Sequence, residues 1–377
     1  MPNPAYPPAL ETFWLNRATA LRQPPNTDTL LDQLRPEVSR LSDLFTIDRA
    51  AGFGRYGEED TAQLAYGLFF FPQTYVRTRL VLDECLAGGR WTPPSDRPVR
   101  VLDLGAGLGA ALLSAAHALA PRPTTLCALD HAPRSLATLR DLFADQGLTA
   151  ETRVGHLLQP LPAEEKWDLI LCSFALNEAL AGEPGADVPA WLRRLLQHLH
   201  PGGLLLLLEP ALTSASERLE GLRDVLADQG HGRIIAPCLH HLPCPLRRDG
   251  RSFCHEVRRW AAPKSMTYLN RHLFRDLQVL KYSFLAVTQT ERPPTPAEAT
   301  RARLIAPVDE QNGKVVTRGC AADGLTHEYE VLTRHLSRDE QAALAATERG
   351  ARVHWPELVS KSKGRVLRAA GKPTIEE

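Results

Sequence analysis

The sequence predicts an α/β fold whose core is a doubly wound, mostly parallel sheet with helices on both faces. Strand-like and helix-like segments alternate through the middle of the chain, which is typical of such sheets. A glycine-rich turn follows the first of these strands, where cofactor-binding sheets place their glycine loop. The most apolar run, Leu204–Leu208, is far too short to cross a bilayer, so we interpret it as a buried strand.

Composition narrows the class of protein. The chain has 377 residues, which favours two or three structural units. Its 44 basic and 44 acidic residues give a formal net charge of zero, so a nucleic-acid site would have to be a local patch. The first residues lack a signal-peptide pattern, and seven cysteines do not indicate a secreted disulfide scaffold. We therefore expect a cytoplasmic monomer with no membrane partner.

Helical segments fill the N-terminal part after a proline-rich start. We expect residues 1–30 to form a loosely held arm. Apolar residues recur at helical spacing from Thr29 to Phe45, and a second helical stretch runs from Glu58 to Leu86 with a break at Pro72. The sequence thus predicts a helical domain over residues 1–95, bounded by a proline-rich link.

The middle of the chain, residues 96–230, contains the alternating elements. The predicted strands are Val99–Leu104, Thr125–Leu129, Trp167–Ser173 and Leu204–Leu208. The predicted helices are Ala110–Leu119, Arg134–Phe143 and Val188–Leu199. Cys172 lies inside an apolar strand and is interpreted as a core thiol.

The last third of the chain changes character. Residues 231–290 are rich in Cys and Arg and end in a predicted strand, Tyr282–Thr288, that closes the sheet. A proline-rich link (292–296) leads to a small β-rich unit over residues 291–377. Its predicted strands are Arg303–Pro307, Lys314–Arg318 and His327–Leu332, and the basic tail Ser360–Pro373 is expected to be mobile.

The glycine loop is the first candidate site. Gly105, Gly107 and Gly109 lie between a strand and a helix, and glycine lets the backbone turn sharply and approach a ligand. Asp130 ends the next strand, 27 residues after Asp103, where a carboxylate can bind a ribose diol. The alternatives are a dinucleotide site and a tight turn that binds no ligand.

Two details resemble the class I S-adenosylmethionine (SAM) methyltransferases. Asp103 precedes the first glycine by two positions, and Pro201-Gly202-Gly203 leads into an apolar strand. The resemblance implies that Asp103 and the glycines Gly105, Gly107 and Gly109 hold the methionine part of SAM, and that Asp130 holds the ribose. Many members contact adenine through an acid, but His156 stands near that position here. It is our candidate for that contact, and a surface residue without this role is the alternative.

The loop after the third of these predicted strands would face the transferred methyl group. It reads Ser173-Phe174-Ala175-Leu176-Asn177-Glu178, which is neither the amine-gripping box of N-methylating enzymes nor the Pro-Cys pair of cytosine-C5 enzymes. Asn177 and Glu178 are the catalytic candidates, and they could equally cap the next helix. Methyl transfer requires mainly in-line positioning, so catalysis stays open.

Four cysteines stand in loop-like sequence beside Pro or Gly or at a strand end: Cys238, Cys244, Cys254 and Cys320. Their spacing matches no paired zinc-finger pattern, so chemistry alone leaves zinc, iron–sulfur or no metal open. His240, His241 and His255 are possible substitute ligands.

The cysteine segments resemble a known family. They read APC-x5-CPL, FCH and, after a KYSFLAV strand, GC; residues 65–79 (AYGLFFFPQTYVRTR) add to the likeness. This is similar to methyltransferase-like proteins of the bacterial and mitochondrial small ribosomal subunit. The resemblance implies SAM binding, a role in small-subunit assembly or translation, a four-iron four-sulfur cluster on the four cysteines and, in a eukaryote, the mitochondrial matrix.

A local basic excess fits such a partner. Residues 231–282 hold ten Lys or Arg against three acids, interleaved with aromatic residues. We expect rRNA contacts from Arg247, Arg248, Arg251, Arg258 and Arg259, although a solvated basic surface is the alternative. Three functions follow: a non-catalytic SAM-binding assembly factor, which we favour, an active rRNA methyltransferase, or an iron–sulfur oxidoreductase.

Overall fold

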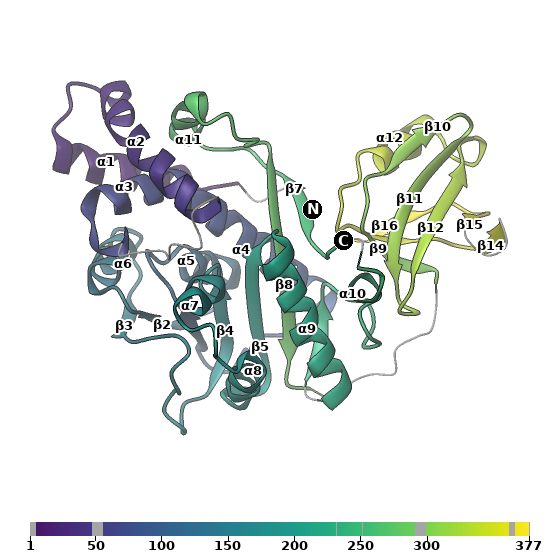
Figure 1. The fold of residues 1–377 in the computed structure, drawn as a ribbon, viewed down its shortest axis with the longest axis horizontal. Helices are drawn as coiled ribbons and strands as arrows, with labels where there is room; N and C mark the ends of the chain where they lie inside the picture. Colours follow the sequence, from purple (N-terminus) through teal and green to yellow (C-terminus); the bar gives the residue numbers. More distant parts are fainter. Residues whose placement is uncertain are drawn as a thin grey trace.

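The computed structural model describes residues 5–46, 56–230, 232–250, 252–290, 299–361 and 366–376. Two β-sheets dominate it (Figure 1). The larger sheet is flanked by helices and carries the glycine loop, and the smaller sheet forms a separate C-terminal unit beside it.

The larger sheet has the strand order β3-β2-β1-β4-β5-β8-β6, with β7 also pairing with β8. Strands β1 to β5 run parallel to one another, and β8 runs antiparallel to β5. The order reverses beside β1, which places the loop after β1 at the position where such sheets bind ligands. The predicted doubly wound sheet is confirmed. Its strands are β1 (Val99–Leu104), β2 (Thr124–Asp130), β3 (Ala150–Val154), β4 (Trp167–Ser173), β5 (Leu199–Pro210), β6 (Arg233–Ala236), β7 (Glu256–Arg259) and β8 (Val279–Thr288).

Alternate residues of each strand point to opposite faces of the sheet, and both faces are buried in hydrophobic clusters. In β4, Leu169 and Leu171 belong to one hydrophobic cluster, while Ile170 and Cys172 belong to the other. Cys172 is therefore a core thiol, as predicted. Helices α5 (Ala110–Leu119) and α6 (Pro133–Asp145) cover the first face; α7 (Leu176–Gly182), α8 (Val188–Gln197) and α9 (Thr213–Gln229) cover the second. Helix α9 is absent from the sequence-based prediction.

The N-terminal helices are confirmed, with one difference. The predicted second stretch is two helices that meet at Phe70, because Pro72 lies in the first turn of α4, where a missing N–H leaves no hydrogen bond unmade. The elements are α1 (Pro8–Arg22), α2 (Thr27–Thr46), η2 (Tyr56–Glu58), α3 (Asp60–Phe69), α4 (Phe71–Leu86) and η3 (Ala87–Gly89).

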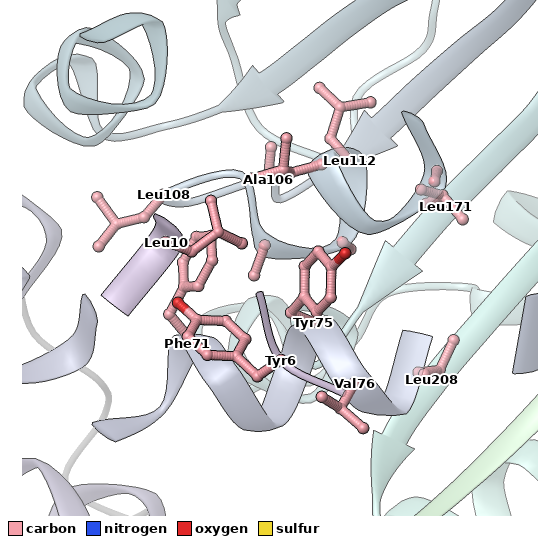
Figure 2. Packing of buried hydrophobic residues seen from close by; sticks show 14 of the residues in the cluster. Tyr6, Leu10, Phe71, Tyr75, Val76, Ala106, Leu108, Leu112, Leu171 and Leu208 are labelled. Carbon is pink, nitrogen blue, oxygen red and sulfur yellow. The ribbon is translucent and has the colours of Figure 1, made fainter. Parts of the chain in front are cut away.

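The expectation of a loose N-terminal arm is wrong. Helix α1 buries Leu10, Trp14 and Ala18 completely, and these residues are spaced four apart along one helix face. The proline content hid this stripe, since Pro8 only starts the helix. Figure 2 shows the result: Tyr6, Leu10, Phe71 and Tyr75 gather against the segment that follows β1.

The C-terminal unit is built on a second sheet of order β14-β15-β12-β11-β9-β13-β16, with β10 pairing to β11. The rings of Tyr329 and Trp355 stack at its centre, 4.9 Å apart. Its strands are β9 (Arg301–Leu304), β10 (Asp309–Gln311), β11 (Lys314–Ala321), β12 (Thr326–Leu332), β13 (Arg352–His354), β14 (Leu358–Lys361), β15 (Val366–Ala369) and β16 (Thr374–Glu376), with η5 (Thr333–His335) and α12 (Arg338–Ala345). The segment between the sheets adds α10 (Pro245–Asp249), α11 (Lys264–Leu269) and η4 (Asn270–His272). The predicted 292–296 link lies outside the described residues.

The basic tail is ordered where it is described, contrary to the prediction. Strand β15 pairs with β12, Ala369 is fully buried, and Arg368 forms an ion pair with Glu330. The alternation of Leu367 and Ala369 with polar residues explains why this segment joins the sheet. Among the described residues, no helix combines the length and apolarity that a membrane crossing requires.

Candidate cofactor and cysteine sites

A cavity of about 290 Å³ opens at the end of β1, over the glycine loop. Gly105 adopts a left-handed φ of 74° and lines the cavity. A methyl group on Gly105 would lie 2.3 Å from Ala175 Cβ, so no other residue fits there without displacing the neighbouring loop. Gly107, with a φ of 51°, faces open space, and its N–H donates to Asp130 Oδ2 over 2.8 Å.

Asp103 is a buried carboxylate on the wall of this cavity, and one of its oxygens has no hydrogen-bond partner among the described residues. Its side chain is 1% exposed, and Oδ2 accepts a hydrogen bond from the Leu112 N–H at 3.1 Å. The other oxygen, Oδ1, is buried and has no hydrogen-bond partner among the described residues. Burial raises the pKa of Asp103 to about 7, and the nearby charge of Asp130 adds to the increase. A buried acceptor with no donor is costly, so it marks a place for a donor or a cation.

Asp130 ends β2 and is held by the backbone. Oδ2 accepts from Gly107 and Oδ1 accepts from the Ala132 N–H, also at 2.8 Å. These bonds fix the carboxylate at the cavity wall. A carboxylate has about four acceptor positions, so two remain for a ligand such as a diol.

The structure places the other predicted loop residues differently. His156 lines the cavity; its Nδ1 accepts a hydrogen bond from the Leu158 N–H at 3.4 Å and lies 3.7 Å from Glu183 Oε1. Gly109 does not line the cavity. A side chain on Gly109 would meet Leu139 and Phe143 of α6, so this glycine serves helix packing.

Residues of the N-terminal helices form another wall of the cavity, and the sequence analysis did not predict this wall. Tyr56, Gln63, Tyr66 and Thr74 line this side. The Tyr56 hydroxyl lies 3.1 Å from Glu178 Oε2, and the rings of Tyr56 and Tyr66 stack 6.0 Å apart. Burial, with the charge of Glu178, raises the pKa of Tyr66 to about 12, so its phenol stays protonated at neutral pH. No spacing rule links these residues to a loop so far along the chain.

The loop after β4 forms the remaining wall. Ser173, Phe174 and Glu178 line the cavity, whereas Asn177 does not. Phe174 has a left-handed φ of 62°, and the Arg77 guanidinium lies 5.2 Å from its ring. Burial lowers the pKa of Arg77 to about 10, so it remains a cation at neutral pH. Of the two catalytic candidates, only Glu178 reaches the cavity.

A second cavity, of about 40 Å³, lies between the large sheet and the C-terminal unit. All four predicted cysteines line it: Cys238, Cys244, Cys254 and Cys320. Burial raises the pKa values of Cys244, Cys254 and Cys320, and the neighbouring Cys238 raises them further. The fold therefore brings together thiols separated by up to 82 positions in the sequence.

Polar residues on one side of α9 hold the cysteine loops. Glu220 Oε1 accepts from the Cys254 N–H at 2.6 Å, and Asp224 Oδ1 accepts from the Cys244 N–H at 2.8 Å. Arg223 is 2% exposed and donates to the His240 carbonyl at 2.9 Å. His240 Nε2 lies 3.6 Å from Cys320 Sγ, so this predicted substitute ligand contacts one of the four cysteines.

The side chains are not arranged around a metal ion. The described part of the chain contains no group of three or more His, Cys, Asp or Glu side chains that could hold one. The donor set itself, four cysteines around one cavity with a buried guanidinium beside them, has the composition of a thiolate site.

The arginines predicted to contact RNA differ in their exposure to solvent. Arg247 is 53% exposed and lies 3.5 Å from Asp224; Arg248 is exposed, and Arg259 is 76% exposed. Arg258 is 15% exposed and is engaged by Glu256 and the Arg349 carbonyl, so it is a structural residue of β7. Arg251 lies outside the described residues.

Comparison with known proteins identifies the family. The family model described as "Mitochondrial small ribosomal subunit Rsm22" matches residues 60–370, which is 311 of the 377 residues. The chain belongs to the Rsm22 family. This confirms the resemblance to methyltransferase-like proteins of the small ribosomal subunit. The Rsm22 match includes the glycine loop, all four cysteines and most of the C-terminal sheet.

Solved structures give weaker likenesses. TehB from Haemophilus influenzae is 14% identical over 52% of this chain and 59% of its own, with a TM-score of 0.33. The ribosomal protein L11 methylase from Lactobacillus delbrueckii subsp. bulgaricus is 15% identical over 58% and 80%, with a TM-score of 0.35. The plantazolicin methyltransferase BpumL, solved with SAH, is 13% identical over 69% and 98%, with a TM-score of 0.37. Comparison with curated proteins finds no match. The class I methyltransferase-like fold rests on the strand order and the glycine loop.

Proposed function

We propose that this Rsm22-family chain binds SAM over the glycine loop and associates with small-subunit rRNA to support assembly or translation of the small ribosomal subunit. The observation that carries the SAM proposal is Asp103, a fully buried carboxylate on the cavity wall with one unpartnered oxygen. An ammonium group such as that of SAM supplies the missing donor and the compensating charge.

The remaining walls suit the rest of this cofactor. Gly105 lets a ligand approach the backbone closely, and Asp130 has acceptor capacity left for a ribose diol. His156, at the cavity edge, is the proposed adenine contact. Bound SAM supplies an electrophilic methyl group.

Association with the small subunit is proposed from the family and from surface charge. The family description names the mitochondrial small ribosomal subunit, and we propose the mitochondrial matrix if the source is a eukaryote. Arg247, Arg248 and Arg259 remain exposed for phosphate contacts. Arg258 is left out of this proposal because its guanidinium is engaged within the protein.

For the second cavity we propose a four-iron four-sulfur cluster on Cys238, Cys244, Cys254 and Cys320, with zinc as the alternative. The convergence of the four thiols supports it. A cluster there would fix the loops of residues 238–254 and so hold the exposed Arg247 and Arg248 of α10 in place for rRNA.

The test replaces two ligands at once. Cys238→Ser with Cys244→Ser is expected to remove bound iron, measured by metal analysis and visible absorbance after anaerobic purification, and to abolish co-sedimentation with small subunits. The matched control is Cys85→Ser with Cys172→Ser, two buried thiols outside this cavity. Stoichiometric zinc in the wild type would overturn the cluster, and unchanged sedimentation of the iron-free protein would overturn its link to rRNA.

Catalysis is the second candidate function, favoured by the end of β4. Phe174 holds a left-handed conformation and the Ser173 hydroxyl is buried without a partner among the described residues, both at the cavity wall. Transfer of labelled methyl from SAM to protein-free small-subunit rRNA, lost in Asp103→Asn, would establish the activity. Absence of transfer while SAM binds would assign the site to binding alone.

A further inference from the structure

The loop between α11 and β8 exposes one aromatic ring. Phe274 is 87% exposed, and it is the most exposed large hydrophobic side chain of the described residues. Its neighbours point inward: Leu269 is fully buried, and Leu273 and Leu277 pack against the main core. The loop is therefore anchored by three apolar side chains, and among its described apolar residues Phe274 is the exposed one.

The backbone conformation of the loop directs the Phe274 ring toward solvent. Phe274 has a left-handed φ of 50°, which a bulky residue rarely adopts. Asn270 fixes it: its side-chain oxygen accepts from the Arg275 N–H at 3.1 Å, its amide donates to the Arg275 carbonyl at 2.8 Å, and its own carbonyl accepts from the N–H groups of Leu273 and Phe274. A strained conformation that is over-determined in this way is typical of a functional position.

Two arginines, Arg271 and Arg275, flank Phe274 in the sequence, and they differ in their partners. The Arg271 guanidinium lies 4.3 Å from the centre of the Tyr268 ring, and it forms no ion pair with any of the described residues. Arg275 reaches back to Ser42 at 3.0 Å and lies 3.8 Å from Asp43, which ties the loop to α2. Asp276, which follows Arg275 in the sequence, is an exposed acid. Figure 1 shows α11 at an edge of the molecule, next to the N-terminal helices and away from the C-terminal sheet.

We propose that Phe274 stacks on an unpaired RNA base while Arg271 contacts the adjoining phosphate. Stacking requires only one free ring face, and aromatic rings with arginines are the usual readers of splayed bases. A protein partner is the other class that uses exposed aromatics. The core of a protein interface is depleted of charge, however, and Phe274 stands between two arginines and an aspartate rather than in an apolar patch.

This inference rests on the proposed small-subunit association and names the surface that performs it. The test measures binding of the full chain to two probes: purified small ribosomal subunits and protein-free small-subunit rRNA. Phe274→Asn removes the ring and keeps a residue that tolerates the left-handed φ. Phe274→Tyr keeps the ring. Val359→Ala removes an exposed apolar side chain on β14 and serves as the matched control.

The expected result is a loss of at least roughly fivefold in affinity for both probes in Phe274→Asn, because one stacked base contributes that much. Phe274→Tyr and Val359→Ala should bind as the wild type does, and all variants should keep the wild-type melting temperature. Equal binding of Phe274→Asn and wild type overturns the inference, and a loss seen with subunits but not with bare rRNA assigns the ring to a protein. A wild type that binds neither probe overturns the proposed function itself.

Discussion

Asp103 shows how one buried atom can define a site. Its position at the end of β1 buries the carboxylate, and the fold supplies one hydrogen bond, from Leu112, where an ionised carboxylate accepts several. Asp168, at the opposite end of β4, is equally buried, but Arg97 donates to both of its oxygens at 2.6 Å and the Arg100 N–H adds a third bond at 2.9 Å. The first carboxylate is left for a ligand, and the second stabilises the fold.

This contrast predicts opposite effects for two identical substitutions. Asp103→Asn should lower SAM affinity by at least about tenfold, since it removes a charge-assisted bond. It should not lower the melting temperature at pH 8. There the wild-type carboxylate is ionised above its raised pKa, so its burial costs folding free energy that Asn avoids.

Asp168→Asn is the control, and we expect it to affect stability rather than SAM binding. It breaks a buried ion pair, so the melting temperature should fall while SAM affinity stays at the wild-type value. Calorimetric titration and thermal unfolding of both variants provide the two readouts. Equal loss of stability in the two variants would show that Asp103 is a structural residue.

At the scale of elements, strand β9 joins the C-terminal unit to the rest of the chain. Arg303 is 3% exposed and donates to both oxygens of Glu84 on α4, at 2.7 and 3.0 Å, and to Glu256 on β7 at 2.9 Å. Burial alone would raise the pKa of Glu84, but Arg303 holds it below its ordinary value. Arg303 also lines the cysteine cavity, so this joint and that site share a wall.

Removing this arginine should be costly. Arg303→Met removes the cation that Glu84 and Glu256 share and leaves them with Arg90, 3.6 Å from Glu84, and Arg258 beside Glu256. We expect a loss of about 3 kcal/mol in the free energy of unfolding at pH 7.5, the lower end for a broken buried ion pair. Stability gained from a carboxyl with a lowered pKa is present at neutral pH and is lost as the pH falls through that pKa. The difference between variant and wild type should therefore shrink in acid.

Arg301→Met is the matched control on the same strand. Arg301 is 59% exposed and pairs with Glu376 at the surface, so its loss should change stability by about 1 kcal/mol or less. Denaturant unfolding of both variants gives the comparison. Similar small losses would mean that the buried network does not hold the units together.

Elements with strong local signals were predictable. Val99–Leu104, Ala110–Leu119 and Trp167–Ser173 have the same bounds in sequence and structure, because apolar runs ending in Gly or polar residues define them. Helix α9 was missed although Leu219, Leu222 and Leu226 are buried at helical spacing. Its inner side also carries Glu220, Arg223 and Asp224, which interrupt this apolar pattern in the sequence. The reason for those polar residues, the cysteine loops, lies outside the helix itself.

At the scale of the whole molecule, both candidate sites are assembled from distant segments. The glycine loop and Asp130 were predictable because they are local to two strand ends. The wall formed by Tyr56 and Tyr66 was not, since it depends on how the N-terminal helices pack on the sheet. Likewise, the cysteines could be chosen from the sequence, but Cys320 joins the others only because β11 packs beside the segment that follows β6.

The most direct test of the central claim is a titration of the wild-type chain with SAM at pH 7.5 and pH 6. One SAM should bind per chain, and the affinity should fall about fivefold at pH 6, because Asp103, with a pKa of about 7, becomes protonated. Lowering the pH can only increase the charge of the amino group of SAM, so that group cannot cause the loss. Absence of binding at pH 7.5, or binding that is the same at both pH values, would contradict a SAM site built on Asp103.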